Sequence, residues 1–520
     1  MEKSYRQTGA CLDNPCAVLR TPVEEDWAQI RYILNVVAAG DGPANPDQLA
    51  NLHKRLLQLT GNLRTENRPI RQDALLKYLE SNSRKFFSHD LPLLAALVSR
   101  LDDFFPSGLQ FITPENPQVH LRKIQALTLI AAAFLGVIPH NQRALLEHHP
   151  KKFKMNLNKF DMFYRGFMER EAKFKSVLMY FESMRERLGD CWTEMVKTDS
   201  VLTAPCTSVC ECSRLVDGTS IAPTDELIGF YRQTNQAVDF VWRGGSVTGT
   251  SMAVSIDDIA RSTKPLGDFN VLPGRDLTFA DGDLQVDFAD QYLGGLSMFE
   301  NHIAQEELIF ITYPEMLPVM LFSDIMKANE AVIVKGVERF VFSRGYEWSF
   351  KIEQAAGRWS KLLPGKHHSV QGVVPLDSLG RRDVTIVGMD AVQFFDKDKQ
   401  YSQKMVDREL LKATVGFKGD PYEATVSRSH KAVATGLWGC GVFNGDVELK
   451  ALIQWLAASY LGRAVNFYSP VVKYQKNMDH VISKIGRTYS TVADLYNAIQ
   501  RAVKRRQVGS SRWSLWEQLV

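Results

Sequence analysis

The sequence predicts an α/β protein in which a helical N-terminal region precedes a mixed, largely parallel sheet with helices on both faces. In the first part of the chain, apolar residues recur every three or four positions, as on the buried face of a helix. From about Leu284 onward, short β-branched and aromatic runs alternate with helical segments, which is typical of a sheet covered by helices. We therefore predict a helical accessory region at residues 1–187, an irregular insertion or linker at 188–283 and an α/β domain at 284–520.

The individual elements follow from the same patterns. Helical spacing runs through 46–62, 89–105, 120–139 and 170–189. The most apolar run, 126–138, is shorter than a membrane span and follows two basic residues, so we expect a buried helix there. The predicted strands are 284–289, 307–313, 331–342, 383–395 and 464–469, and the predicted helices among them are 316–328, 402–417, 445–462 and 491–506.

Composition and charge exclude several classes of protein. With 45% hydrophobic and 23% charged residues, the 520-residue chain can bury a substantial core and is not disordered. A net charge of +3 is too small for binding nucleic acid through bulk charge, so we expect no direct DNA binding. The seven cysteines are unevenly placed and do not indicate a disulfide framework, and the N-terminus lacks a secretory apolar core. We expect a reduced, intracellular, soluble monomer without membrane association.

Some shorter motifs favour ordinary structure over a binding site. Cys206, Cys210 and Cys212 could begin a zinc site, but a fourth ligand at suitable spacing is missing, so a loop with free thiols is favoured. The stretch 242–252 resembles a phosphate loop, yet no P-loop lysine follows it, and a flexible insertion is favoured. The basic end, 501–513, suits a nuclear signal or a polymer-binding patch, but more often such a run is the solvated face of a terminal helix.

The strongest candidate for chemistry is the triplet Gln305, Glu306 and Glu307, which leads directly into apolar residues. An apolar setting disfavours a charged carboxylate, and a second carboxylate nearby adds to this effect, which suits a general acid. Neighbouring side chains of a regular element diverge, so both carboxylates can serve one ligand only at an irregular junction. We predict such a junction between a glycine loop and a strand at 307–313. Taken alone, the triplet favours the alternative of an ordinary helix start with acidic residues in its first turn.

Two glycine-rich stretches strengthen the prediction of a ligand site. Gly294 and Gly295 let the backbone approach a ligand and present N–H groups to a diphosphate. The stretch 434–446, ATGLWGCGVFNGD, precedes a strongly helical segment, so it can hold an anion at a helix N-terminus. Each stretch alone is weak evidence, but both together with a carboxylate pair form a more specific constellation.

These residues resemble the catalytic domain of the poly(ADP-ribose) glycohydrolase family. The similarity runs with gaps from about Ile124 to Arg505, and it rests on VDFADQYLGG, QEELIF, DAVQF, RELLKATVGF and ATGLWGCGVFNGDVELKALIQ, which occur in the family's order. The resemblance implies a macrodomain-like mixed sheet flanked by helices at 284–520, with the helical N-terminal region packed on it. It also implies a hydrolase that cleaves the ribose–ribose bonds of poly(ADP-ribose) on modified proteins and needs no metal or cofactor.

The resemblance further implies roles for single residues. Glu307 would be the general acid and base, Glu306 would bind ribose hydroxyls, Asp287 would shape the site and Tyr346 would stack on the ligand. Because the polymer is made at damaged chromatin, the resemblance implies a role in the DNA damage response, in nucleus and cytoplasm. The other expected ligand contacts are Asp290, Gly294, Gly295, Gln305, Gly439, Cys440, Gly441, Val442, Phe443 and, as an aromatic wall, Phe467 or Tyr468.

The first glycine loop departs from the family pattern. Leu296 replaces a third glycine, which would cost about 1 kcal/mol if that position needed a positive φ. Met298 and Phe299 would either crowd a diphosphate or point into the core. Asp290 replaces an asparagine and would add a negative charge near the glutamates, which favours a protonated acid but repels a phosphate. We expect these changes to affect turnover more than ligand class.

Two rival hypotheses follow. The first is an ADP-ribose or poly(ADP-ribose) binding module that has lost catalysis through the altered loop. The second is a nucleotide-sugar or NAD-utilising enzyme of the Rossmann type. The absence of Gly-x-Gly-x-x-Gly right after the first strand argues against it.

Overall fold

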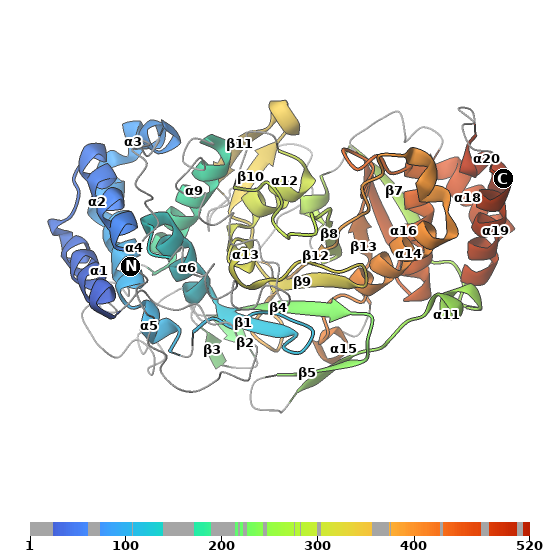
Figure 1. Ribbon diagram of the computed structural model, residues 1–520, viewed down its shortest axis with the longest axis horizontal. Helices are drawn as coiled ribbons and strands as arrows, with labels where there is room; N and C mark the ends of the chain where they lie inside the picture. Colours follow the sequence, from blue (N-terminus) through green and yellow to red (C-terminus); the bar gives the residue numbers. More distant parts are fainter. Residues whose placement is uncertain are drawn as a thin grey trace, which may run out of the picture.

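The centre of the molecule is an eight-stranded sheet with the order β1–β4–β9–β12–β8–β13–β14–β7 (Figure 1). In that order the strands are β1 (Gln118–Arg122), β4 (Leu227–Thr234), β9 (Glu330–Gly336), β12 (Arg382–Gly388), β8 (Leu284–Asp287), β13 (Val433–Thr435), β14 (Val465–Ser469) and β7 (Phe269–Pro273). This computed structural model describes residues 24–60, 73–106, 108–138, 171–188, 214–216, 219–221, 226–242, 247–274, 276–280, 282–298, 303–355, 374, 376–426, 430–469, 478–506 and 513–520.

The sheet has an antiparallel part and a parallel part. The neighbours from β1 to β12 pair antiparallel, whereas β12, β8, β13, β14 and β7 pair in parallel. Along β9, Val332 and Val334 face one apolar core, while Ala331 and Ile333 face the other. Both faces of the sheet are therefore buried, and the predicted mixed sheet between helices is confirmed.

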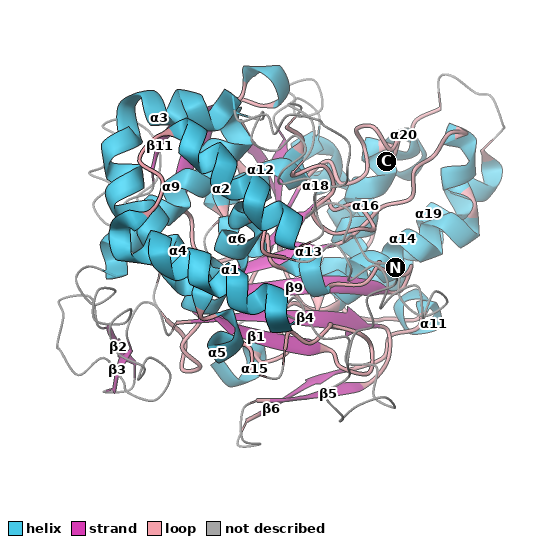
Figure 2. Ribbon diagram, turned by 60° about the vertical axis from the view of Figure 1, so that its left-hand side comes forward, coloured by secondary structure: helices cyan, strands magenta, loops and turns pink. Residues whose placement is uncertain are grey.

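Helices cover both faces of this sheet (Figures 1 and 2). The first core contains α12 (Gln305–Thr312), α13 (Val319–Phe322) and the helical N-terminal region. The second core lies against α14 (Gln403–Phe417), α16 (Val447–Tyr460) and α19 (Val492–Arg505). Shorter helices around the second core are α11 (Ile256–Ala260), α15 (Glu423–Val426), α18 (Met478–Thr488) and α20 (Leu515–Leu519).

The helical region shares its core with the sheet. Its helices are α1 (Glu24–Val36), α2 (Pro46–Leu59), α3 (Asp73–Lys85), α4 (Leu91–Ser99), α5 (Leu101–Phe104), α6 (Lys123–Leu135) and α9 (Glu171–Leu188). Every residue of α6 except Gln125 is buried, which confirms the buried helix predicted there. None of the described helices combines the length and the apolarity needed to span a membrane. The helix predicted from residue 120 begins only at Lys123, because the preceding residues pair with β4 as strand β1.

Three further predictions of secondary structure need correction. The strand predicted at 307–313 is wrong, because residues 307–312 belong to helix α12 and Tyr313 is its C-cap. A short apolar run fits a buried strand and a buried helix equally well. The run 331–342 divides into β9 and β10 (Val341–Arg344), which forms a hairpin with β11 (Lys351–Ala355). The strand predicted at 383–395 ends at Gly388.

The expected irregular insertion at 188–283 supplies two strands of the central sheet. β4 lies between β1 and β9, and β7 forms the far edge, so the described residues at these two strands are regular and not irregular as predicted. The phosphate-loop-like stretch contains β6 (Thr248–Ser251), which pairs with β5 (Val238–Val241). A third hairpin joins β2 (Arg214–Val216) and β3 (Thr219–Ile221). Cys206, Cys210 and Cys212 lie outside the described residues.

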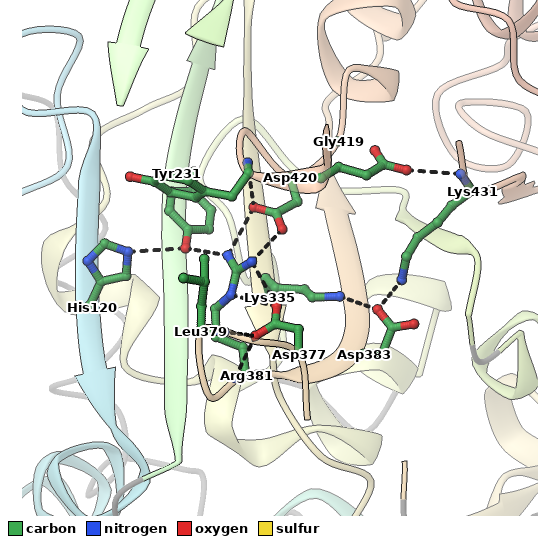
Figure 3. Close-up of polar contacts among 12 residues, drawn as sticks. His120, Tyr231, Lys335, Asp377, Leu379, Arg381, Asp383, Gly419, Asp420 and Lys431 are labelled. Carbon is green, nitrogen blue, oxygen red and sulfur yellow. Dashed lines mark hydrogen bonds and ion pairs between the residues drawn. The ribbon is translucent and has the colours of Figure 1, made fainter. Parts of the chain in front are cut away.

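A buried network of charged side chains lies at the end of the sheet where the parallel strands begin (Figure 3). Arg381 donates to both carboxylate oxygens of Asp420, at 3.0 and 2.7 Å, and pairs with Asp377 at 2.8 Å. Arg381 also donates to the Tyr231 hydroxyl at 2.7 Å. This hydroxyl lies 3.1 Å from Nε2 of His120 in the edge strand β1. These groups satisfy one another, so this end of the sheet has a structural role.

Candidate active site

The two glycine-rich stretches lie side by side at the carboxyl ends of the parallel strands. β8 and β13 are adjacent and parallel, so their carboxyl ends reach the same edge. The first glycine loop, 288–298, follows β8, and the second glycine loop, 436–446, follows β13. At their starts the loops touch, since a Cβ added to Gly436 would lie 3.5 Å from Cζ of Phe288. Ligands of open α/β sheets bind outside the carboxyl ends of the strands.

Glu306 and Glu307 form the first turn of α12 and are only 6% and 5% exposed. Glu306 accepts hydrogen bonds from the N–H groups of Gly294 at 2.6 Å and Asp290 at 3.1 Å. Gly295, with φ +40°, lies directly against this carboxylate, because a Cβ there would stand 2.0 Å from Glu306 Oε2. The first glycine loop therefore wraps around the start of α12.

The neighbouring carboxylate, Glu307, is held by the same loop and by its own helix. Its Oε1 accepts from the N–H of Leu296 at 3.1 Å, and its Oε2 accepts from the N–H of Ala304, the N-cap residue, at 2.9 Å. Both carboxylates thus contact one loop from a regular helix. The prediction of an irregular junction is therefore wrong, and the alternative of acidic residues in a first helical turn is correct.

This geometry gives the first loop glycines a role that differs from the prediction. The N–H of Gly294 is used by Glu306, and the N–H of Gly295 donates to the Tyr292 carbonyl at 3.0 Å. Neither group is presented to a diphosphate in the described structure. Both glycines have positive φ, and an added Cβ would meet Met320 at Gly294 and the Glu306 carboxylate at Gly295.

The departures from the family pattern are accommodated locally. Leu296 does not adopt a positive φ, so the expected backbone strain is absent, and its side chain is 43% exposed. Met298 is buried in the first core, which confirms one of its two predicted orientations, whereas Phe299 lies outside the described residues. Asp290 accepts from the N–H of Tyr292 at 2.8 Å and so helps to fold its own loop.

Asp287 and Gln305 lie at the end of β8, where the first glycine loop begins. Asp287 ends β8 fully buried, and among the described residues neither carboxylate oxygen has a hydrogen-bond partner. Burial raises the pKa of Asp287 well above its usual value, and the charge of Glu307 raises it further. Gln305 accepts from the N–H of Phe288 at 2.7 Å and donates to the Val286 carbonyl at 2.9 Å, so it joins α12 to the end of β8.

The second glycine loop offers free backbone donors. Among the described residues, no acceptor bonds the N–H groups of Gly441, Val442 and Phe443, and the Val442 side chain is 76% exposed. Asp446 ends the loop as the N-cap of α16 and accepts from the N–H of Leu449 at 2.8 Å. The anion site predicted at this helix N-terminus stays a prediction.

Lys450 was not predicted from the sequence, and it packs against Gly439 of the second glycine loop. A Cβ at Gly439 would stand 3.0 Å from Lys450 Nζ, and this ammonium lies 3.9 Å from the ring centroid of Trp438. Its salt-bridge partner is Glu409. A lysine inside the apolar run VELKALIQ was the signal for this role. The predicted contact Cys440 is half-buried, and burial raises the pKa of its thiol, so it has no thiolate character.

Tyr346 lies close to the carboxylates. It precedes a short 3-10 helix, η8 (Glu347–Ser349), which docks on the segment before α12 because the Glu347 N–H donates to the Ile303 carbonyl at 3.1 Å. Burial, followed by the charges of Glu307 and Glu347, raises the pKa of Tyr346 to about 12, although its side chain is still 39% exposed. The structure thus brings this predicted ligand platform to the start of α12.

Phe467 does not line this site. It is buried in the second core, stacked on Phe269 with 5.5 Å between ring centroids. Its predicted role as an aromatic wall therefore has no support in the described geometry. Tyr468 lies on the opposite face of β14 and is half-buried, with its carbonyl against Gly436. The described residues contain no group of three or more potential metal ligands.

Two sequence models of one family match the chain. The model for the macro domain fold of poly(ADP-ribose) glycohydrolase matches residues 256–477, and the model for its helical domain matches residues 78–200. The chain belongs to the poly(ADP-ribose) glycohydrolase family. The match to the macro fold begins before the boundary predicted at 284, and it includes the edge strand β7.

Members of the poly(ADP-ribose) glycohydrolase family from a plant and a nematode are similar to this chain. It is 32% identical over 269 residues to probable poly(ADP-ribose) glycohydrolase 2 of Arabidopsis thaliana, covering 44% of this chain and 48% of that protein. Poly(ADP-ribose) glycohydrolase 1 of the same plant is 31% identical over 303 residues, covering 45% and 52%. Poly(ADP-ribose) glycohydrolase 1 of Caenorhabditis elegans is 35% identical over 191 residues, covering 36% and 23%. The chain spans about half the length of the two plant relatives.

Proposed function

We propose that this protein hydrolyses the ribose–ribose glycosidic bonds of poly(ADP-ribose) and releases ADP-ribose. The observation that carries the proposal is the position of Glu306 and Glu307, which are buried at the start of α12 and held by the first glycine loop. That loop touches the second glycine loop at Phe288 and Gly436. The membership of the family and the names of its relatives support the same activity.

In the proposed mechanism, Glu307 is the general acid and base. It gives a proton to the departing ribose oxygen as the glycosidic bond breaks, and it then takes a proton from the water that attacks the anomeric carbon. Glu306 binds ribose hydroxyls and positions the bond. The second glycine loop holds the diphosphate of the substrate. The anionic oxygens of this diphosphate stabilise the oxocarbenium-like centre. No step needs a metal or a cofactor.

Several fixed contacts support these roles. Each carboxylate accepts two backbone N–H groups, which restricts its orientation before a substrate binds. Buried Asp287, whose pKa is raised, favours the neutral form and so adds little negative charge beside Glu306 and Glu307. The exposed face of Tyr346 is available for stacking on the ligand.

The Glu307→Gln variant tests the proposal. With labelled poly(ADP-ribose), we expect the variant to release ADP-ribose at least about 100-fold more slowly than the wild type, because the proton donor is lost. Its affinity for ADP-ribose should stay close to that of the wild type. The control is Glu353→Gln, which removes a carboxylate paired with Arg344 at the surface and should leave turnover unchanged. A Glu307→Gln variant as fast as the wild type would refute the role of Glu307.

A second candidate function is an ADP-ribose binding module without turnover. The exposed Leu296 side chain in the first glycine loop favours it, since a family glycine is replaced at that position. Calorimetry that detects ADP-ribose binding, together with no product from polymer after long incubation, would select this function.

We also propose that the substrate is polymer attached to modified proteins, acted on in the nucleus and the cytoplasm as part of the response to DNA damage. The protein would act as a monomer without direct DNA binding. Imaging of the tagged protein before and after DNA damage tests its location, and gel filtration tests its oligomeric state.

A further inference from the structure

The helical region contributes a side chain to the first glycine loop. Lys173 lies in the first turn of α9 and is buried, and its Nζ donates to the Leu296 carbonyl at 2.8 Å. The N–H of Leu296 in turn donates to Oε1 of Glu307 at 3.1 Å. A single loop residue therefore connects an ammonium group of the helical region with the proposed general acid.

The same helix packs against α12, which carries both glutamates (Figure 1). Met179 of α9 joins Leu308 and Ile311 of α12 in a small apolar cluster. Since Leu308 directly follows Glu307, this cluster fixes the helix that carries the carboxylate. Lys173 acts at the same time on the loop that faces it. Helix α9 therefore contacts both the first glycine loop and helix α12, whose relative position sets the orientation of Glu307.

The first glycine loop needs such an external contact. Gly294 and Gly295 both have positive φ, and glycine restricts the backbone less than any other residue. A hydrogen bond from a charged donor is about twice as strong as a neutral one, so the contact from Lys173 to the Leu296 carbonyl is a strong one. The contact from Lys173 therefore adds a restraint to a loop whose two glycines allow several backbone conformations.

We propose that Lys173 is a positioning residue for catalysis, which fixes the first glycine loop through the Leu296 carbonyl and thereby orients Glu307. The catalytic part of this inference rests on the proposed function, whereas the structural part does not. The helical region then belongs to the working site and is more than an accessory to the macro fold.

Hydrogen exchange measured by mass spectrometry tests the structural part without any turnover. In the full-length Lys173→Met variant, we expect the peptide amides of residues 294–297 to exchange about tenfold faster than in the wild type, because the loop loses its restraint. The matched control is Lys175→Met, which removes an exposed lysine two positions away on α9 and should leave this exchange unchanged. Unchanged exchange in Lys173→Met would overturn the proposal.

Kinetics on labelled polymer tests the catalytic part. We expect Lys173→Met to lower kcat by about 10- to 100-fold while KM and the Kd for ADP-ribose change less than about twofold. Lys173→Arg, which keeps a charged donor, should recover part of kcat. A melting temperature close to that of the wild type separates this effect from unfolding.

The outcomes of the two experiments can be told apart. If kcat and ADP-ribose affinity fall together, or if arginine rescues no better than methionine, Lys173 is merely structural and the proposal is wrong. If the wild type releases no product but exchange in Lys173→Met still rises, the loop contact stands and the proposed function fails.

Discussion

Gly295 shows how closely the site is built at the scale of single residues. Its φ of +40° and its contact with Glu306 leave no room for a side chain, since an added Cβ would meet Oε2 at 2.0 Å. We expect Gly295→Ala to displace the Glu306 carboxylate and to lower the rate of ADP-ribose release at least about tenfold, because misplacement of a positioning group is costly. Product release from labelled polymer measures the effect.

Gly274 is the control that separates the effect of a clash with Glu306 from the effect of backbone strain at a positive φ. Gly274 also has a positive φ, +66°, but a Cβ there would meet nothing within 4 Å. Gly274→Ala should therefore lose about 1 kcal/mol of unfolding free energy through strain and keep its turnover. Equal activity of the two variants would show that the space beside Glu306 is not needed.

At the scale of elements, α16 links the second glycine loop to the core. Asp446 caps this helix through the Leu449 N–H, and its loss leaves a helix donor unsatisfied just below the proposed diphosphate contacts. We expect Asp446→Ala to cost about 1 kcal/mol of unfolding free energy and to weaken ADP-ribose binding. Denaturant unfolding and calorimetry measure the two effects.

Another helix cap provides the control. Thr491 caps α19 and accepts from the Asp494 N–H at 3.1 Å. Thr491→Ala should cost a similar free energy and leave ADP-ribose binding unchanged. If both variants lose affinity equally, the loss reports general destabilisation and the second glycine loop has no special role.

At the scale of the whole molecule, a buried charge cluster joins the helical region to the sheet. Glu338 accepts from Arg187 of α9 at 2.6 and 2.7 Å, and it also pairs with Lys123 of α6 and with Arg382 of β12. Burial alone would favour the neutral carboxyl, but the charges of Lys123, Arg187 and Arg382 outweigh it and lower the pKa of Glu338 well below its usual value. The two parts are therefore expected to unfold together.

We expect Arg187→Met to lower the unfolding free energy by about 3 kcal/mol at neutral pH, because it breaks a largely buried pair. The pKa of Glu338 is lowered on folding, so its pairing stabilises the protein above the pKa of the unfolded state and is lost as pH falls. The gap between wild type and variant should therefore shrink below about pH 4. Urea unfolding at several pH values measures this, with Lys77→Met, which removes an exposed pair with Glu171, as a control of small effect. A gap that grows towards acid pH would contradict this role.

Much of the fold could be predicted because periodicity reports burial. The buried helix α6, the parallel strands β8 and β14 and the helices α14, α16 and α19 all follow from apolar spacing. The candidate site was indicated by paired glutamates after glycines and a glycine-rich run before a helix, which are weak signals alone and more specific together. These signals are local in the chain, so the sequence can carry them.

What the sequence by itself determined is therefore the mixed sheet, the two glycine loops and the pair Glu306 and Glu307. Only the tertiary structure decided that 307–312 is helical, that the Gly294 N–H holds Glu306, and that Lys173 reaches Leu296 from another region. It also placed β4 within the sheet and Phe467 in the core. The physical reason is that a short apolar run satisfies a strand and a helix alike, and that a hydrogen bond depends on a partner distant in the chain, which no local pattern specifies.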